Sequence, residues 1–209
     1  MKLFCINNQN KLIGKKVQKR FRTILGSGKF ILGKNVTKIE DQLKKRVKSK
    51  YCITTSSGTD ALLISLMALG IKNGDEVITT AFTYIATVEV ILRLGAKPVF
   101  ADIKSSTGLI DENDIKKKIT NKTKAIIAVS LFGNIPNFKK IKSFANDVFV
   151  IEDAAQSFGS SYDGNFSCNL ADIGCTSFYP TKNLSCYGDG GAVFTNSKKI
   201  AKKIYLIRN

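Results

Sequence analysis

The chain has 209 residues, of which 44% are hydrophobic and 23% charged, the composition of an ordinary globular protein with one domain. It contains no histidine, which excludes Ser-His-Asp and Cys-His nucleophile pairs and the HExxH zinc motif. The net charge of +17 is compatible with nucleic-acid binding, but the basic residues are scattered over amphipathic stretches without a stacking motif, which favours solvated helix faces.

Cysteine usage and hydropathy set the expected compartment. The five cysteines are an odd number and include no CxxC pair, so disulfides and structural zinc are not expected. The longest apolar run, residues 61–71, is too short to span a bilayer, and no secretory signal is recognised. We therefore expect a cytoplasmic protein with no membrane partner and no metal.

Residues 1–50 are expected to form an N-terminal helical segment. Apolar residues at helical spacing predict a surface helix over residues 11–25, which ends at the glycine-containing residues 26–28. A short apolar crossing is expected at residues 29–33, and a second amphipathic helix runs through residues 36–47. Neither helix carries recognisable chemistry.

From Tyr51 onward, strands alternate with helices. Strands are predicted at residues 51–54, 77–80, 99–102, 125–130 and 148–151, and helices at residues 60–69, 85–94, 112–119, 138–146 and 197–209. This alternation predicts an α/β core over residues 51–209 with a parallel sheet covered on both faces. In such sheets functional residues collect at the carboxyl ends of the strands.

The first candidate site is the turn at residues 56–59, where a glycine lies between hydroxyl residues. The turn follows a strand and opens a helix, so its backbone N–H groups and the positive end of the helix dipole suit a phosphate. An ordinary helix cap is the alternative interpretation.

Two charged side chains complete the candidate site. Asp153 follows the apolar residues 148–151 and is expected to be buried, which requires a cationic or hydrogen-bonding partner; a turn cap is the alternative. Lys182 lies between a strand-like run and the glycine cluster of residues 188–191. That setting can hold an amine still and partly desolvated for attack on a carbonyl, although a solvated lysine is the alternative.

Together these features match the requirements of pyridoxal phosphate (PLP). The cofactor needs a lysine for its aldehyde, a carboxylate for its protonated ring nitrogen and a helix N-terminus for its phosphate. The missing histidine also fits, because the released lysine amine can itself move the proton.

The sequence resembles the PLP-dependent sugar-nucleotide aminotransferases of the DegT/DnrJ type, which have aspartate aminotransferase fold type I. The matching motifs are residues 28–33, 57–62, 74–78, 82–87, 151–156, 177–178 and 188–191. The resemblance implies a three-layer sandwich with a mostly parallel central sheet. Family chains are nearly twice as long, so residues 1–209 would be an incomplete PLP-binding large domain without the C-terminal small domain.

The resemblance also implies roles for individual residues. Lys182 would bind the cofactor covalently, and Asp153 would pair with the pyridine nitrogen. Gln156 would lie near the phenolic oxygen, and Tyr84 would stack on the ring. The phosphate would be held by the turn at Gly58, by Thr59, by the backbone at Asp60 and by Ser177.

The implied reaction transfers an amino group from glutamate to a keto-sugar nucleotide, and the enzyme would be a homodimer. Residues 50–53, 129–133, 167–170 and 186–188 look most like enzymes that aminate a UDP-3-keto-N-acetylhexosaminuronate for lipopolysaccharide O-antigen synthesis. A related dehydratase branch has histidine in place of Lys182. Two other hypotheses remain open: a catalytically inactive remnant of such an enzyme, and a basic nucleic-acid-binding protein.

Overall fold

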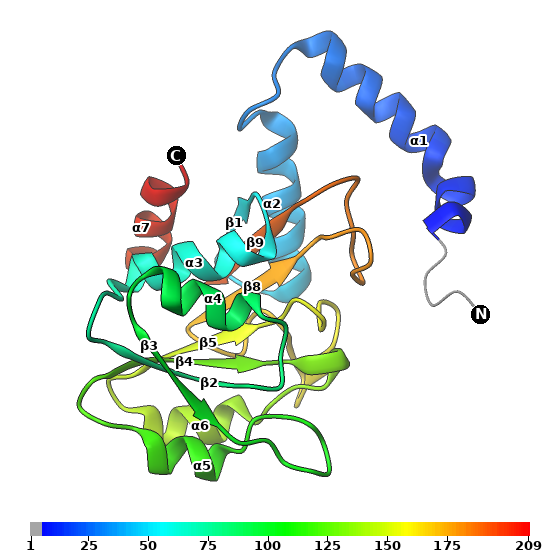
Figure 1. The fold of residues 1–209 in the computed structure, drawn as a ribbon. Helices are drawn as coiled ribbons and strands as arrows, with labels where there is room; N and C mark the ends of the chain where they lie inside the picture. The colour runs from blue at the N-terminus through cyan, green and yellow to red at the C-terminus, as the bar shows by residue number, and fades with distance from the viewer. Residues whose placement is uncertain (1–5) are drawn as a thin grey trace.

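The computed structural model describes residues 6–209 and shows an α/β body with an N-terminal helical arm (Figure 1). The elements are α1 (Ile6–Ser27), α2 (Lys34–Val47), β1 (Tyr51–Thr55), α3 (Gly58–Leu69), β2 (Glu76–Thr80), α4 (Ala86–Arg93), β3 (Lys97–Ala101), α5 (Glu112–Lys118), β4 (Thr123–Val129), η1 (Leu131–Gly133), α6 (Phe138–Ala145), β5 (Phe149–Asp153), β6 (Ser161–Tyr162), β7 (Asn165–Phe166), β8 (Ile173–Ser177), β9 (Gly191–Thr195) and α7 (Lys198–Arg208). None of the helices in this range combines the length and the apolar character needed to cross a bilayer.

A seven-stranded sheet forms the middle layer, in the order β1-β9-β8-β5-β4-β2-β3. The pairs β2–β3, β2–β4, β4–β5 and β5–β8 are parallel, whereas β9 is antiparallel to both of its neighbours, β1 and β8. It follows that β1 runs in the same direction as β8. The predicted mostly parallel sheet is confirmed, and the carboxyl ends of β1, β8, β5, β4 and β2 meet at one edge.

Both faces of the sheet are covered, as neighbouring residues of β4 show. Ile127 is buried in a core with α3, α4 and α7, whereas Ile126 is buried in a second core with α5 and α6. Successive strand residues point to opposite faces, so a run of buried aliphatic residues marks a strand between two helical layers. Figure 1 shows α3, α4 and α7 on one side of the sheet and α5 and α6 on the other.

The N-terminal arm differs from the body. Helix α2 packs on the β1 side of the sheet and buries Leu43 and Val47, whereas α1 projects away from the body (Figure 1). The apolar crossing expected at residues 29–33 is a loop between the two helices, and its apolar side chains are exposed. Gly28 and Leu32 have positive φ angles of 63° and 47°, which turn the chain between the two helices.

The predicted helices and strands are present with small shifts of their ends. The antiparallel strand β9 and the hairpin β6–β7 were not predicted, because glycines and polar residues interrupt the alternation there. Strand β5 ends at Asp153, two residues later than the strand predicted at residues 148–151. These differences leave the predicted position of the site at the strand ends unchanged.

Candidate functional site

A cavity of about 470 Å³ opens at the carboxyl edge of the sheet. Five strands of common direction lead into it: β1 through Ser57, β8 through Ser177, β5 through Asp153, β4 through Val129 and β2 through Thr83. The volume lies within the range of small-molecule and cofactor sites. The parallel topology therefore brings together residues that are separated by more than a hundred positions in the chain.

Seven of the eight predicted site residues line this cavity; they are Gly58, Thr59, Tyr84, Asp153, Gln156, Ser177 and Lys182. Asp60 does not line it. Its backbone N–H donates instead to Ser57 Oγ at 3.0 Å, the helix-cap bond that was the alternative interpretation of this turn. The role predicted for the Asp60 backbone therefore competes with an existing hydrogen bond.

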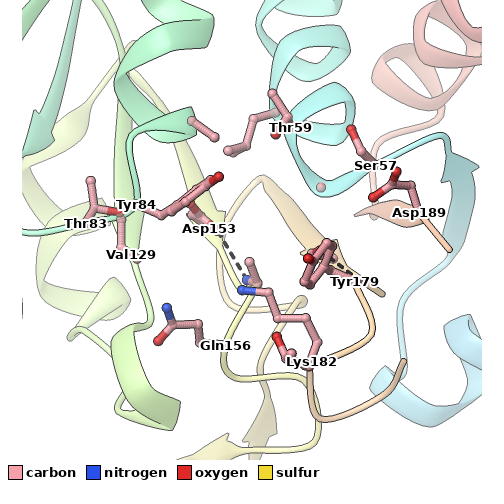
Figure 2. Close-up of a pocket in the computed structure, with 16 residues that line it drawn as sticks. Ser57, Thr59, Thr83, Tyr84, Val129, Asp153, Gln156, Tyr179, Lys182 and Asp189 are labelled. Atoms are coloured by element: carbon pink, nitrogen blue, oxygen red, sulfur yellow. Dashed lines mark hydrogen bonds between the residues drawn. The ribbon is translucent and has the colours of Figure 1, made fainter. Parts of the chain in front are cut away.

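Lys182 and Asp153 lie in the same cavity on different elements. Figure 2 shows the Lys182 side chain, from the loop after β8, directed toward Asp153 at the end of β5. Burial raises the pKa of Asp153, and the positive charge of Lys182 offsets a small part of that rise. An amine and a carboxylate therefore face one cavity, and Tyr84, which is 70% exposed, lies at its mouth.

Asp153 is buried and held from two sides. Thr87 Oγ1 donates to its Oδ2 at 2.8 Å, and the backbone N–H of Ala155 donates to its Oδ1 at 3.2 Å. Burial raises the pKa of this carboxyl above its ordinary value, while Thr87, Ala155 and Lys182 act in the opposite direction. The expected hydrogen-bonding and cationic partners of Asp153 are thus present in the structure.

Gln156 has a defined amide orientation. Its Oε1 accepts a hydrogen bond of 2.9 Å from the backbone N–H of Phe132, a residue with a positive φ of 54°. Because the oxygen is occupied by that donor, the Nε2 amide is the end that remains available in the cavity. Gln156 therefore presents hydrogen-bond donors to whatever the cavity binds.

The N-terminus of α3 closely approaches the end of β8. A Cβ atom added to Gly58 would lie 2.6 Å from Ser177 Cβ, so only glycine fits there. The first-turn N–H groups of Gly58 and Thr59 have no partner within the helix. Ser177 Oγ accepts from the N–H of Tyr179 at 3.2 Å, which leaves its hydroxyl hydrogen free to donate. These donors form a cradle for an anion.

The loop that carries Lys182 is closed by backbone hydrogen bonds. Phe178 N donates to Gly190 O at 2.7 Å, and Cys186 N donates to Phe178 O at 2.8 Å. Within the loop, the N–H of Lys182 donates to Tyr179 O at 2.8 Å. Gly191 is required where the loop enters β9, because an added Cβ would lie 2.3 Å from Ser57 O. Lys182 therefore lies on a loop that is closed by backbone hydrogen bonds.

Several lining residues were not predicted from the sequence. Tyr179, Thr181 and Asp189 flank Lys182 in the chain, so their proximity to it could have identified them. Thr83 precedes Tyr84 and could have been found in the same way. Thr87 ends the motif of residues 82–87, but nothing in the sequence marks it as a partner of Asp153, which is 66 residues away.

A second buried carboxylate, Glu152, precedes Asp153 in β5. Glu152 Oε1 accepts from Ser130 Oγ at 2.8 Å and from Ser167 Oγ at 2.6 Å, and its Oε2 accepts from Cys168 N at 2.8 Å. Burial raises the pKa of Glu152, and these three donors oppose that rise. The network fixes the segment after the β6–β7 hairpin against the end of β5.

The chain matches the DegT/DnrJ/EryC1/StrS aminotransferase family over residues 11–209. It belongs to this family. A UDP-2-acetamido-2-deoxy-3-oxo-D-glucuronate aminotransferase from Pseudomonas aeruginosa is 50% identical over 201 residues, which cover 95% of this chain and 56% of that protein. The chain thus spans about half the length of the curated relatives it matches.

Solved structures confirm the fold assignment. DesV from S. venezuelae has a TM-score of 0.95 at 31% identity, covering 98% of this chain and 56% of that chain. NtdA from Bacillus subtilis, solved with the cofactor PMP, has a TM-score of 0.86 at 38% identity, covering 91% of this chain and 43% of that chain. The fold is that of the PLP-dependent aminotransferases, and structures in this group carry PLP or PMP.

Proposed function

We propose that this chain forms the PLP-binding large domain of a sugar-nucleotide aminotransferase. The observation that carries the proposal is the presence of Lys182 and Asp153 in the lining of one cavity at the strand ends. Residues 51–209 would provide the cofactor-binding core, and residues 1–50 the N-terminal helical segment.

The residues present fit PLP. The cradle formed by Gly58 and Ser177 has no room for a larger residue at position 58, and it offers N–H and hydroxyl donors to a phosphate. Asp153 is a buried acceptor for a protonated ring nitrogen, and the Nε2 of Gln156 is a donor for a phenolic oxygen. These donors and acceptors match the polar groups of the cofactor one by one.

When bound, PLP supplies an aldehyde that accepts an amine and a protonated ring that withdraws electrons. Lys182 would attach to that aldehyde and, once released, would move a proton with its free amine. Asp153 would hold the proton on the ring nitrogen, and Tyr84 would cover the ring at the mouth of the cavity. Thr59, Ser177 and the first turn of α3 would hold the phosphate.

We further propose glutamate as the amino donor and a UDP-3-keto-N-acetylhexosaminuronate as the acceptor, in cytoplasmic synthesis of a surface polysaccharide such as the O-antigen of lipopolysaccharide. The support is the 50% identity to the Pseudomonas aeruginosa enzyme, which is named as an aminotransferase of a 3-oxo-glucuronate nucleotide. A homodimer is proposed because Lys182 is the one basic residue lining the cavity among residues 6–209, and a phosphate dianion needs further positive charge.

The test is an amination assay with purified chain, PLP, glutamate and UDP-2-acetamido-2-deoxy-3-oxo-D-glucuronate. Formation of 2-oxoglutarate and of the amino sugar in equal amounts supports the full proposal, and Lys182→Ala should abolish both. A chain that binds PLP through Lys182 but aminates nothing is the inactive remnant. A chain that does not bind PLP at all contradicts the proposal.

A further inference from the structure

Asp153 is the end point of a chain of two hydroxyl groups. Thr87, in the first turn of α4, is 1% exposed, and its Oγ1 lies 2.8 Å from Asp153 Oδ2. Thr83, one turn earlier, places its Oγ1 3.1 Å from Thr87 Oγ1. An ionised carboxylate can only accept hydrogen bonds, so the single hydrogen of the Thr87 hydroxyl goes to Asp153. Thr83 must therefore donate to Thr87.

This arrangement gives each carboxylate oxygen one donor from the protein. Thr87 donates a hydrogen bond to Oδ2, and the Ala155 N–H donates one to Oδ1. Two donors on different oxygens fix the plane of the carboxylate, and the remaining acceptor positions are left for the cavity. The hydroxyl of Thr87 does not line the cavity, whereas Thr83 and its neighbour Tyr84 do. The loop that positions Tyr84 is thus linked to Asp153 by hydrogen bonds.

We propose that Thr87, supported by Thr83, is a positioning residue that keeps Asp153 ionised and directed at the ring nitrogen of PLP. This proposal rests on the proposed function. Burial disfavours the ionised carboxylate, and a hydroxyl donor restores part of the lost solvation. Without that donor the carboxyl is more readily protonated, and a protonated carboxyl cannot neutralise the ring. Thr87 therefore acts on the cofactor through Asp153.

PLP binding should depend on pH through Asp153. Thr87 lowers the pKa of Asp153 against the larger effect of burial, so its removal should raise that pKa further. PLP affinity should be lost as pH falls through the pKa of Asp153, and this acid limit should move to higher pH in Thr87→Val. The other titratable groups near Asp153 are Lys182, Glu152 and Cys175. They are the same in the wild type and in every threonine variant.

The experiment is a PLP titration of the purified chain, followed by visible absorption at several pH values. The signal of Lys182→Ala is subtracted, because surface lysines also react with an aldehyde. Thr87→Val should weaken PLP binding roughly tenfold to a hundredfold, the range for a hydrogen bond to a charged group. Thr87→Ser keeps the donor and should restore both the affinity and the acid limit.

The matched control is Thr79→Val, which removes another buried threonine hydroxyl. Thr79 Oγ1 donates to Ile127 O at 3.0 Å and does not line the cavity, so the variant should keep the wild-type affinity and acid limit. If a thermal melt shows that Thr87→Val does not fold, Thr83→Val is the deciding variant. It should weaken PLP binding in the same direction by a smaller factor.

Two results would overturn the inference in distinguishable ways. Folded Thr87→Val with wild-type affinity and an unshifted acid limit would show that Thr87 does not act on Asp153, while the proposed function would stand. A wild-type chain that does not bind PLP through Lys182 would remove the proposed function and this inference with it. If Thr83→Val is the deciding variant, wild-type behaviour overturns the inference equally.

Discussion

Ile127 in β4 and Leu12 in α1 are aliphatic side chains of equal size, yet Ile127 is fully buried and Leu12 is 83% exposed. Ile127 lies between the sheet and α3, in a core that joins strands and helices from across the body. Leu12 lies on a helix that projects from that body (Figure 1) and is connected to it by a hydrogen bond from Tyr187 Oη to Asn10 Oδ1.

This contrast in burial shows which part of the chain provides its stability. Apolar area removed from water contributes about 25 cal/mol per Å², so the body gains from its aliphatic residues and α1 gains little from its own. Helix α1 also has no acidic residue in its first turn and no basic residue in its last turn, and so lacks favourable charge–dipole interactions. The free energy of unfolding should therefore depend on residues 51–209 far more than on α1.

The largest effect is expected for Ile127→Ala. Truncation of this side chain leaves a cavity between two layers and should lower the free energy of unfolding by about 2–5 kcal/mol. Urea unfolding followed by circular dichroism measures this change as a lower midpoint at constant slope. A loss below about 0.5 kcal/mol would contradict the burial on which the comparison depends.

A smaller loss is expected for Ser167→Ala, which removes one donor from the buried carboxylate Glu152. The expected cost is about 1–3 kcal/mol, because a buried acceptor loses part of its solvation. The same urea experiment measures it. Ser143→Ala is the matched control, since that serine is exposed and its hydroxyl bonds to Lys140 O within α6; equal losses for the two variants would refute the role of the network.

Asp153→Asn should change stability in the opposite direction. Burial raises the folded-state pKa of Asp153 above its unfolded value, so the wild type loses stability as pH rises through that raised pKa. Asparagine has no charge to bury, and the variant should be more stable than the wild type at neutral pH and equal to it in acid. Thermal melts across this pH range give the difference; a variant less stable at neutral pH would contradict the assignment.

The smallest effect is expected for Leu12→Ala. The side chain is exposed on α1, so the free energy of unfolding of the purified chain should change by no more than about 0.5 kcal/mol. The urea midpoint measured beside that of Ile127→Ala gives the comparison directly. A loss comparable to that of Ile127→Ala would show that α1 is packed against apolar surface in solution.

Much of the fold could be predicted because its strands are buried on both faces. Residues 125–129, for example, are all apolar, whereas the intervening helices have apolar residues at helical spacing. The strand β9 escaped prediction because it begins at Gly191, whose small size is required by a tertiary contact with Ser57. No local pattern reports such a contact.

The site was predictable to the extent that chemistry marks its residues. Lys182 and Asp153 are conspicuous in their segments, and parallel topology then brings strand ends together. The Asp60 backbone and Thr87 show the limit. Whether an N–H is already used by a cap, or a helical hydroxyl reaches a distant carboxylate, depends on three-dimensional contacts.

The proposed function depends above all on Lys182 as the amine that would hold PLP. The most direct measurement is borohydride reduction of the PLP-loaded chain followed by peptide mass spectrometry, with Lys182→Ala and the exposed, non-lining Lys124→Ala as a matched pair. We expect the added mass on the peptide containing Lys182, with the visible band lost in Lys182→Ala and kept in Lys124→Ala. Label spread over surface lysines, with the same band in both variants, would contradict it.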